Sequence, residues 1–299
     1  MKITLALILV LISFESFSCD VCGGVVSPGT QGLLPTKQFH FIGTRFRYDH
    51  FTSNTNYSGV SRSSTEHFLR ASLYGRWQFA SKFDLQAEVP FAYNLQEEED
   101  STRSHTGLGD ISVVCNYELI NNKNEAKETS HILRSGVGMK LPTGYYSKDA
   151  WETNNLFPGT GSFDLVLSTN YVFTKKKLGL LNEFSFLFPT ENKAGYKRGE
   201  SLIARMNGFY KIQLSNWQFL PALGASYIFS NTDKIYNIPV TQTFNNGQSI
   251  NSELSLNLIS NKWMLNAKYS YPIYQNINDG EVESKGTAQL GIYYLFQKK

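Results

Sequence analysis

The feature that most constrains the fold is a regular alternation of apolar and polar residues that recurs along most of the chain. In residues 82–95, the odd positions are apolar and the even positions are mainly polar. A period of two places alternate side chains on opposite faces of a β-strand, whereas an amphipathic helix requires a period of 3.6. Residues 69–79 show the same pattern, and Ala80-Ser81 between the two runs is short enough for a β-hairpin.

Similar runs occupy most of the remaining sequence, and each is about as long as a strand that crosses a membrane. They lie near 38–51, 111–119, 133–141, 163–173, 180–188, 202–212, 217–229, 254–258, 263–271 and 285–297. With the first two runs, the expected number of strands is about twelve, an even number as in bacterial outer-membrane barrels.

The connections between these runs separate a membrane barrel from a soluble sandwich, which also shows alternation. Short connections are expected at 80–81, 174–177, 214–216 and 260–262, with a longer one near 121–130. Long polar ones are expected at 52–64, 96–106, 142–161, 189–199, 230–249 and 272–284. The sequence therefore predicts an all-β, transmembrane, antiparallel up-and-down β-barrel with short periplasmic turns and long extracellular loops. Aromatic residues gather at the strand ends, where interfacial girdles form.

Composition excludes two other classes. After residue 18 no window approaches the roughly 18 continuous apolar residues that a membrane-spanning helix requires. The formal net charge of +3 is small and scattered along 299 residues, so no nucleic-acid partner is expected.

The first residues match a secretory signal peptide. Lys2 supplies the positive charge, residues 3–12 are apolar, and small residues at Ser16 and Ser18 precede Cys19. We expect a signal peptide over 1–18, an N-terminal periplasmic segment over 19–36 and an outer-membrane barrel over 37–299. Such a chain resides in the bacterial outer membrane, contacts its lipid and is inserted by the barrel-assembly machinery.

Cys19 and Cys22 form a CxxC motif directly after the predicted cleavage point. Three interpretations remain open: a disulfide or structural remnant, a thiolate pair for a soft metal such as Cu(I) or Zn, and lipidation of Cys19. Haem attachment is excluded because Gly23 follows where a histidine is required. Apart from a metal at this pair, no cofactor is expected. Cys115 shares the apolar face of its strand and is interpreted as a small lipid-facing residue.

Two motifs resemble a known family. GLGDIS, residues 107–112, opens a strand after a polar segment, and KLPTG, residues 140–144, is followed by PGTGSFD, residues 158–164. In order and spacing they resemble the outer-membrane transporter-like proteins of the MetA-pathway of phenol degradation family. The resemblance implies a barrel that passes small, often hydrophobic, molecules, and it carries no catalytic residues over to this chain.

The polar half of each strand is expected to face the lumen. Charged residues of both signs lie at these positions, and they would either form a selective constriction or fill the lumen with salt bridges. The candidate lumen-lining residues are Arg70, Arg76, Glu88, Asp110, Glu118, Arg134, Lys140, Asp164, Arg205, Lys211, Glu253 and Lys268.

The function expected is passive passage of small-molecule solutes through an outer-membrane channel. A closed barrel used as a structural or surface-binding module is the alternative, and a barrel hydrolase is the third hypothesis. The hydrolase finds little support among the histidines, because Asp49 and His50 are adjacent in a strand and point to opposite faces. His105 lies in a segment of ordinary loop composition. No enzymatic activity is therefore expected.

Overall fold

A computed structural model describes residues 40–57, 60–148, 156–239 and 246–296 of the chain. These ranges exclude the predicted signal peptide and the N-terminal cysteine motif. Within them, no helix has the length and apolar character needed to cross a membrane.

The described residues form seventeen strands and one short 3-10 helix, η2. In chain order they are β1 (His40–Tyr57), β2 (Val60–Gln78), β3 (Phe83–Glu98), β4 (Thr102–Leu108), β5 (Ser112–Asn124), β6 (Thr129–Lys140), β7 (Asp164–Lys175), β8 (Leu178–Pro189), β9 (Tyr196–Lys197), β10 (Ser201–Tyr210), β11 (Ile212–Leu214), β12 (Trp217–Ser230), β13 (Lys234–Ile235), β14 (Ile238–Pro239), β15 (Gly247–Ile259), β16 (Trp263–Ile277), η2 (Asn278–Gly280) and β17 (Val282–Phe296).

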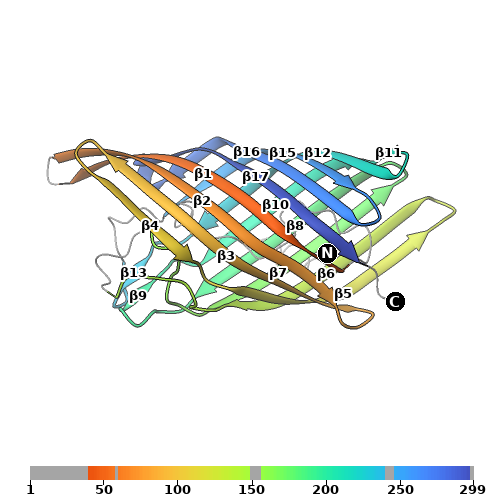
Figure 1. Cartoon of the computed structure of the whole chain (residues 1–299), viewed down its shortest axis with the longest axis horizontal. Coiled ribbons are helices and arrows are strands. Elements are labelled where there is room, and N and C mark those ends of the chain that lie inside the picture. The colour runs from red at the N-terminus through yellow and green to blue at the C-terminus, as the bar shows by residue number, and fades with distance from the viewer. Residues whose placement is uncertain (1–39, 58–59, 149–155, 240–245, 297–299) are drawn as a thin grey trace, which may run out of the picture.

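The strands close into a barrel of antiparallel neighbours (Figure 1). β4 and β5 both pair with β3, and β10 and β11 both pair with β12, so each couple is one interrupted strand of the wall. Pairing of β1 with β17 and of β10 with β12 completes the ring. Counted in this way, the wall of the described chain has twelve strands, as the sequence predicted. Each of the twelve described wall strands thus has a neighbour on both sides over part of its length, and the closed ring avoids the open sheet edge that the hydrocarbon of a membrane excludes.

The alternation in sequence becomes two chemically different faces. Along β3, even positions such as Asp84 and Gln86 are buried inside the barrel, whereas Leu85, Phe91 and Tyr93 are exposed on the outside. The same holds around the wall, so the outer surface is an apolar belt. A belt of this kind is stable only in lipid, and the chain is thus a transmembrane barrel.

Aromatic side chains mark the end of the belt that carries the short turns. Phe83 of β3 contacts Tyr117 of β5 with ring centroids 4.8 Å apart, and Trp263 contacts Tyr294 at 5.2 Å. They form the predicted girdle. We call this end periplasmic and the opposite end extracellular, because short turns face the periplasm in such barrels.

Three of the predicted extracellular loops are mostly strand. The segments expected at 52–64, 96–106 and 272–284 extend the hairpins β1–β2, β3–β4 and β16–β17 beyond the belt. His105, expected in a loop, accordingly lies in β4. The periplasmic connection expected near 121–130 also shortens to a tight turn between β5 and β6. Outside lipid both faces of a strand meet water, so the alternation disappears while the backbone ladder continues.

Three connections at the extracellular end are long. One joins β6 to β7, and the other two join β8 to β10 and β12 to β15. The latter two carry β9, β13 and β14, which pair into a small separate sheet. Figure 1 shows β9 and β13 at the left end of the barrel and β11, at the periplasmic end, on the right.

Candidate functional site

The lumen is the candidate site, and the structure gives a place to each residue predicted to line it. Seven are buried: Arg76, Glu88, Asp110, Glu118, Arg134, Asp164 and Glu253. The other five are half-buried: Arg70, Lys140, Arg205, Lys211 and Lys268. A role for these side chains in selecting solutes remains a prediction.

Two ionic groups join predicted residues that neighbour one another on the inner wall. Arg134 of β6 donates to Glu118 of β5 at 2.7 Å. Glu253 of β15 forms one ion pair with Arg205 at 3.3 Å and another with Lys268 at 2.8 Å. Buried charges are tolerated when paired in this way.

The third group unites the motifs that carry the family resemblance. The ammonium of Lys140 lies 3.1 Å from Asp110 and 2.5 Å from Asp164. Asp110 also accepts bonds from the Gly144 amide at 3.0 Å and the Thr160 amide at 2.9 Å. We call Asp110, Lys140, Gly144, Thr160 and Asp164 the motif cluster. GLGDIS, KLPTG and PGTGSFD, far apart in sequence, thus meet at one place on the inner wall.

Glycines allow the backbones of the three motifs to approach one another closely. A Cβ on Gly144 would lie 2.7 Å from the Cα of Gly159 and 2.9 Å from that of Gly109, both shorter than side chains permit. Gly161 has a φ of +71°, which disfavours other residues, and a Cβ there would lie 2.5 Å from the ring of Tyr146. The glycines of the motifs are therefore needed for backbone contact between the segments.

The described parts of the connection between β6 and β7, residues 141–148 and 156–163, lie against the inside of the barrel, and we call these two segments the inner loop. Leu156 is 2% exposed and belongs to a buried apolar cluster with Phe51 of β1 and Phe68 of β2. Its carbonyl accepts a bond from Asn94 of β3 at 2.8 Å. Because β6 and β7 are separated from β1 and β2 in the ring, the inner loop reaches across other wall strands and narrows the extracellular half of the lumen.

The periplasmic half of the lumen carries apolar side chains on its inner wall. One buried apolar cluster collects residues from ten of the strands described above, and we call it the collar. Its members are Phe41, Tyr74, Ile132, Val172, Leu181, Phe209, Leu220, Ala222, Ile259, Met264, Tyr293 and Leu295. At the same level of the wall, β3 and β5 contribute the buried charged residues Asp84 and Glu118 instead of apolar ones. An apolar lumen wall departs from the polar interior usual in outer-membrane barrels.

Strand glycines seat the rings of the collar. A Cβ on Gly43 would lie 2.8 Å from the ring of Tyr293, and a Cβ on Gly179 would lie 2.1 Å from that of Phe209. Arg45 stacks over Tyr74 at 4.1 Å and donates to the Tyr293 hydroxyl at 3.4 Å. Cation–π contact of this kind holds a guanidinium against a ring.

Several lumen residues were not predicted. Arg45, Arg47 and Asp49 of β1 face inward, as does Asp84 of β3, which pairs with Arg76 at 2.7 Å. The alternation was sufficient to find all four, because each occupies the polar phase of its strand. Leu156 gave no such signal, since a single apolar residue in a loop has no period.

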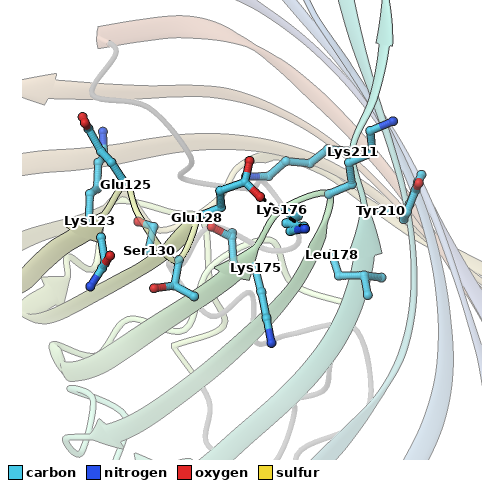
Figure 2. Close-up of a pocket in the computed structure, with 13 residues that line it drawn as sticks. Lys123, Glu125, Glu128, Ser130, Lys175, Lys176, Leu178, Tyr210 and Lys211 are labelled. Carbon is cyan, nitrogen blue, oxygen red and sulfur yellow. Dashed lines mark ion pairs between the residues drawn. The ribbon is translucent and has the colours of Figure 1, made fainter.

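A cavity of about 1020 Å³ lies at the periplasmic rim, between the turns that follow β5 and β7 and the end of β10. Figure 2 shows lysines around it, including Lys123, Lys176 and Lys211. The ion pair between Lys176 and Glu128, at 3.5 Å, is largely exposed, and exposed pairs contribute little stability. Lys211 lines this cavity, and it therefore lies at the periplasmic rim, away from the other predicted lumen residues.

The remaining candidates are dispersed. His50 and His67 stack on the outer face with centroids 4.9 Å apart, while Asp49 points into the barrel. Cys115 is half-buried on the outer face. Within the described ranges no three His, Cys, Asp or Glu side chains are arranged to hold a metal. Cys19 and Cys22 lie outside those ranges.

Comparison with known proteins agrees with the barrel. The family described as "Putative MetA-pathway of phenol degradation" matches residues 41–274, more than half of the chain. An outer membrane channel from Pseudomonas putida F1 superimposes with a TM-score of 0.64 at 16% identity, covering 91% of this chain and 100% of that one. The translocator domain of the autotransporter NalP from Neisseria meningitidis gives a TM-score of 0.47 at 10% identity, covering 89% and 92%. No curated protein sequence matches the chain.

Proposed function

The chain belongs to the MetA-pathway of phenol degradation family, and from this we propose that it is a bacterial outer-membrane channel for passive passage of small hydrophobic molecules. The observation that carries the proposal is the collar. Apolar side chains on the inside of a membrane barrel gain nothing from contact with lipid, which lies on the other face. An apolar inner wall instead offers a surface on which an apolar solute can be desolvated.

The arrangement supports a route in two stages. The inner loop narrows the extracellular half, where the ion pairs of Lys140 with Asp110 and Asp164 join β6 to β7 and to the GLGDIS segment. A solute that passes Leu156 meets the collar, and leaves through the periplasmic rim. No energy-coupling group is needed, because movement follows the concentration gradient.

Uptake of a neutral fluorescent dye such as N-phenyl-1-naphthylamine, which an intact outer membrane excludes, tests the proposal. Cells that produce the full chain should take up the dye faster than cells without it. Leu220→Asn should abolish most of that increase, because it places an amide among apolar collar side chains while keeping the same number of side-chain heavy atoms. Leu214→Asn is the matched control, since Leu214 is exposed at a periplasmic turn. Equal uptake by Leu220→Asn and the parent chain would count against the collar.

A closed structural or surface-binding barrel is the second candidate. It is favoured by the ion pairs Arg76–Asp84 and Arg134–Glu118, all four of whose side chains are buried on the inner wall. Such pairs would equally suit a filled lumen. We propose no catalytic role, because Asp49 and His50 face opposite sides of β1. An impermeable bilayer containing folded barrel would favour this candidate.

A further inference from the structure

Two arginines stand directly opposite each other on the inner wall. Arg47 of β1 and Arg70 of β2 are paired in the ladder between these strands, and both face the lumen. Like charges directly opposite on a sheet destabilise it. Arg47 is partly compensated by Asp49, whose carboxylate lies 2.7 Å away on the same strand. This part of the wall thus concentrates positive charge against the usual preference.

A third arginine reaches the same region from another part of the fold. Arg198 follows β9 and lies within electrostatic range of Arg70. It is 4% exposed, and among the described residues its Nε and Nη1 atoms have no hydrogen-bond partner. Buried guanidinium nitrogens without partners cost free energy, because they have lost water and gained no acceptor. The surroundings of these two nitrogens are therefore suited to an acceptor that the described residues do not provide.

The extracellular sheet fixes Arg198 in position. The next residue, Gly199, donates its amide to Asp233 at 2.8 Å, and a Cβ there would lie 1.6 Å from the carbonyl oxygen of Asn231. Tyr196 donates its hydroxyl to the same Asp233. Both neighbouring segments of the backbone are thus bonded to Asp233. These bonds restrict movement of the loop that carries Arg198.

Neighbouring carboxylates are engaged with other cations. Glu200 accepts from Lys197 at 2.7 Å. Burial raises the pKa of the Glu200 carboxyl, but hydrogen bonds from Lys197 and Asn231 outweigh it and hold that pKa below its usual value. Glu88, which also acts on Arg70, lies 3.5 Å from Arg45. Asp49 and Glu88, the acidic groups that act on Arg70, therefore each share their charge with another arginine, Arg47 and Arg45 respectively.

We propose that Arg47, Arg70 and Arg198, the arginine cluster, bind the carboxylate of a small organic acid. The proposal rests on the proposed function, because the anion is a solute of that channel. Guanidinium groups bind carboxylates through a planar fork with two parallel hydrogen bonds. The collar, further toward the periplasmic end of the same lumen, would take the apolar body of the acid. The ligand class is therefore an amphipathic monocarboxylate rather than a neutral hydrocarbon alone.

Calorimetric titration of the full chain in detergent tests the site, with benzoate as probe and benzyl alcohol as its neutral counterpart. We expect benzoate to bind more tightly than benzyl alcohol. Arg198→Gln should weaken benzoate binding by about tenfold or more, the effect of one charge-assisted interaction, and leave benzyl alcohol unchanged. Arg103→Gln is the matched control, because Arg103 is exposed and pairs with Glu98. Arg70→Gln serves as the second variant should Arg198→Gln fail to fold.

Equal binding of benzoate by the parent chain and a folded Arg198→Gln or Arg70→Gln variant would overturn the site, and so would a parent chain that does not bind benzoate. Failure of the channel is separable from failure of the site. A chain that binds benzoate through Arg198 but passes no solute contradicts the proposed passage alone. A chain that passes neutral dye but does not bind benzoate contradicts the arginine cluster alone.

Discussion

Gly43 leaves room on the inner wall for the ring of Tyr293, because glycine has no Cβ. Tyr293 lies over the bare backbone of Gly43 from the paired strand, and Arg45 holds the Tyr293 hydroxyl from the same wall. The ring can lie against the wall because Gly43 has no Cβ, which would be 2.8 Å from a ring carbon of Tyr293. Sequence alternation identifies Gly43 as an inward position but does not show which ring covers it.

Gly43→Ala should destabilise the barrel by about 1–3 kcal/mol, the usual cost of inserting a methyl group into a packed site. Its Cβ would lie 2.1 Å from the carbonyl oxygen of Ile292. Gly208→Ala is the control, because the nearest atom to its added Cβ is the Leu223 carbonyl oxygen at 3.8 Å. Urea unfolding of the refolded barrels measures the difference. An equal loss of unfolding free energy in both variants would show that the position of Tyr293 does not depend on Gly43.

Asp110 is the residue on which the motif cluster depends. It accepts hydrogen bonds from Gly144, Thr160 and Lys140, and so joins β6 and the inner loop to the junction of β4 and β5. Asp110→Asn retains the shape but replaces an acceptor by a donor opposite the Thr160 amide. We expect a loss of about 1–3 kcal/mol in unfolding free energy. Asp100→Asn, in the exposed turn after β3, should change stability by less than about 0.5 kcal/mol. A similar small change for Asp110→Asn would mean that the cluster is not an anchor.

The inner loop is the element that controls the width of the extracellular half. Its anchor at Leu156 is a small apolar contact and one hydrogen bond from Asn94. Leu156→Ser removes the apolar contact, and we expect single-channel conductance in a planar bilayer to become larger and noisier, because the loop can leave the wall. Ile238→Ser, an exposed apolar position in another extracellular connection, should leave conductance unchanged. Unaltered conductance in Leu156→Ser would exclude the loop as the narrow point.

Strands were predictable within the membrane and less so beyond it. Within the belt one face meets lipid, so apolar residues are required at every second position, and residues 82–95 show this directly. In the hairpin β1–β2 the strands continue to Tyr57 and Val60 through a polar segment, where composition indicates a loop. Backbone pairing, which side-chain composition does not record, determines the true strand ends there.

The whole molecule combines an apolar outer belt with a lumen layered along its axis. Facing directions were predictable because alternation determines them, and so most of the candidate lumen residues are inward. Their partners were not predictable. Whether Lys140 meets Asp110 or Asp164 depends on strand register and on the fold of the inner loop, and neither is encoded locally. The collar was not predicted, because the alternation assigns apolar residues mainly to the outer face. The collar members are apolar residues that lie at inward positions of many different strands, and no local pattern groups them.

Single-channel recording of the full chain in a planar bilayer distinguishes an open lumen from a closed one. We expect discrete conductance steps that are briefly interrupted when phenol is added, because a small apolar solute would occupy the collar and displace water from it. Leu220→Asn should retain the steps and lose the interruptions. A bilayer that stays silent although the barrel is correctly folded would contradict an open lumen and leave the closed, surface-binding barrel in its place.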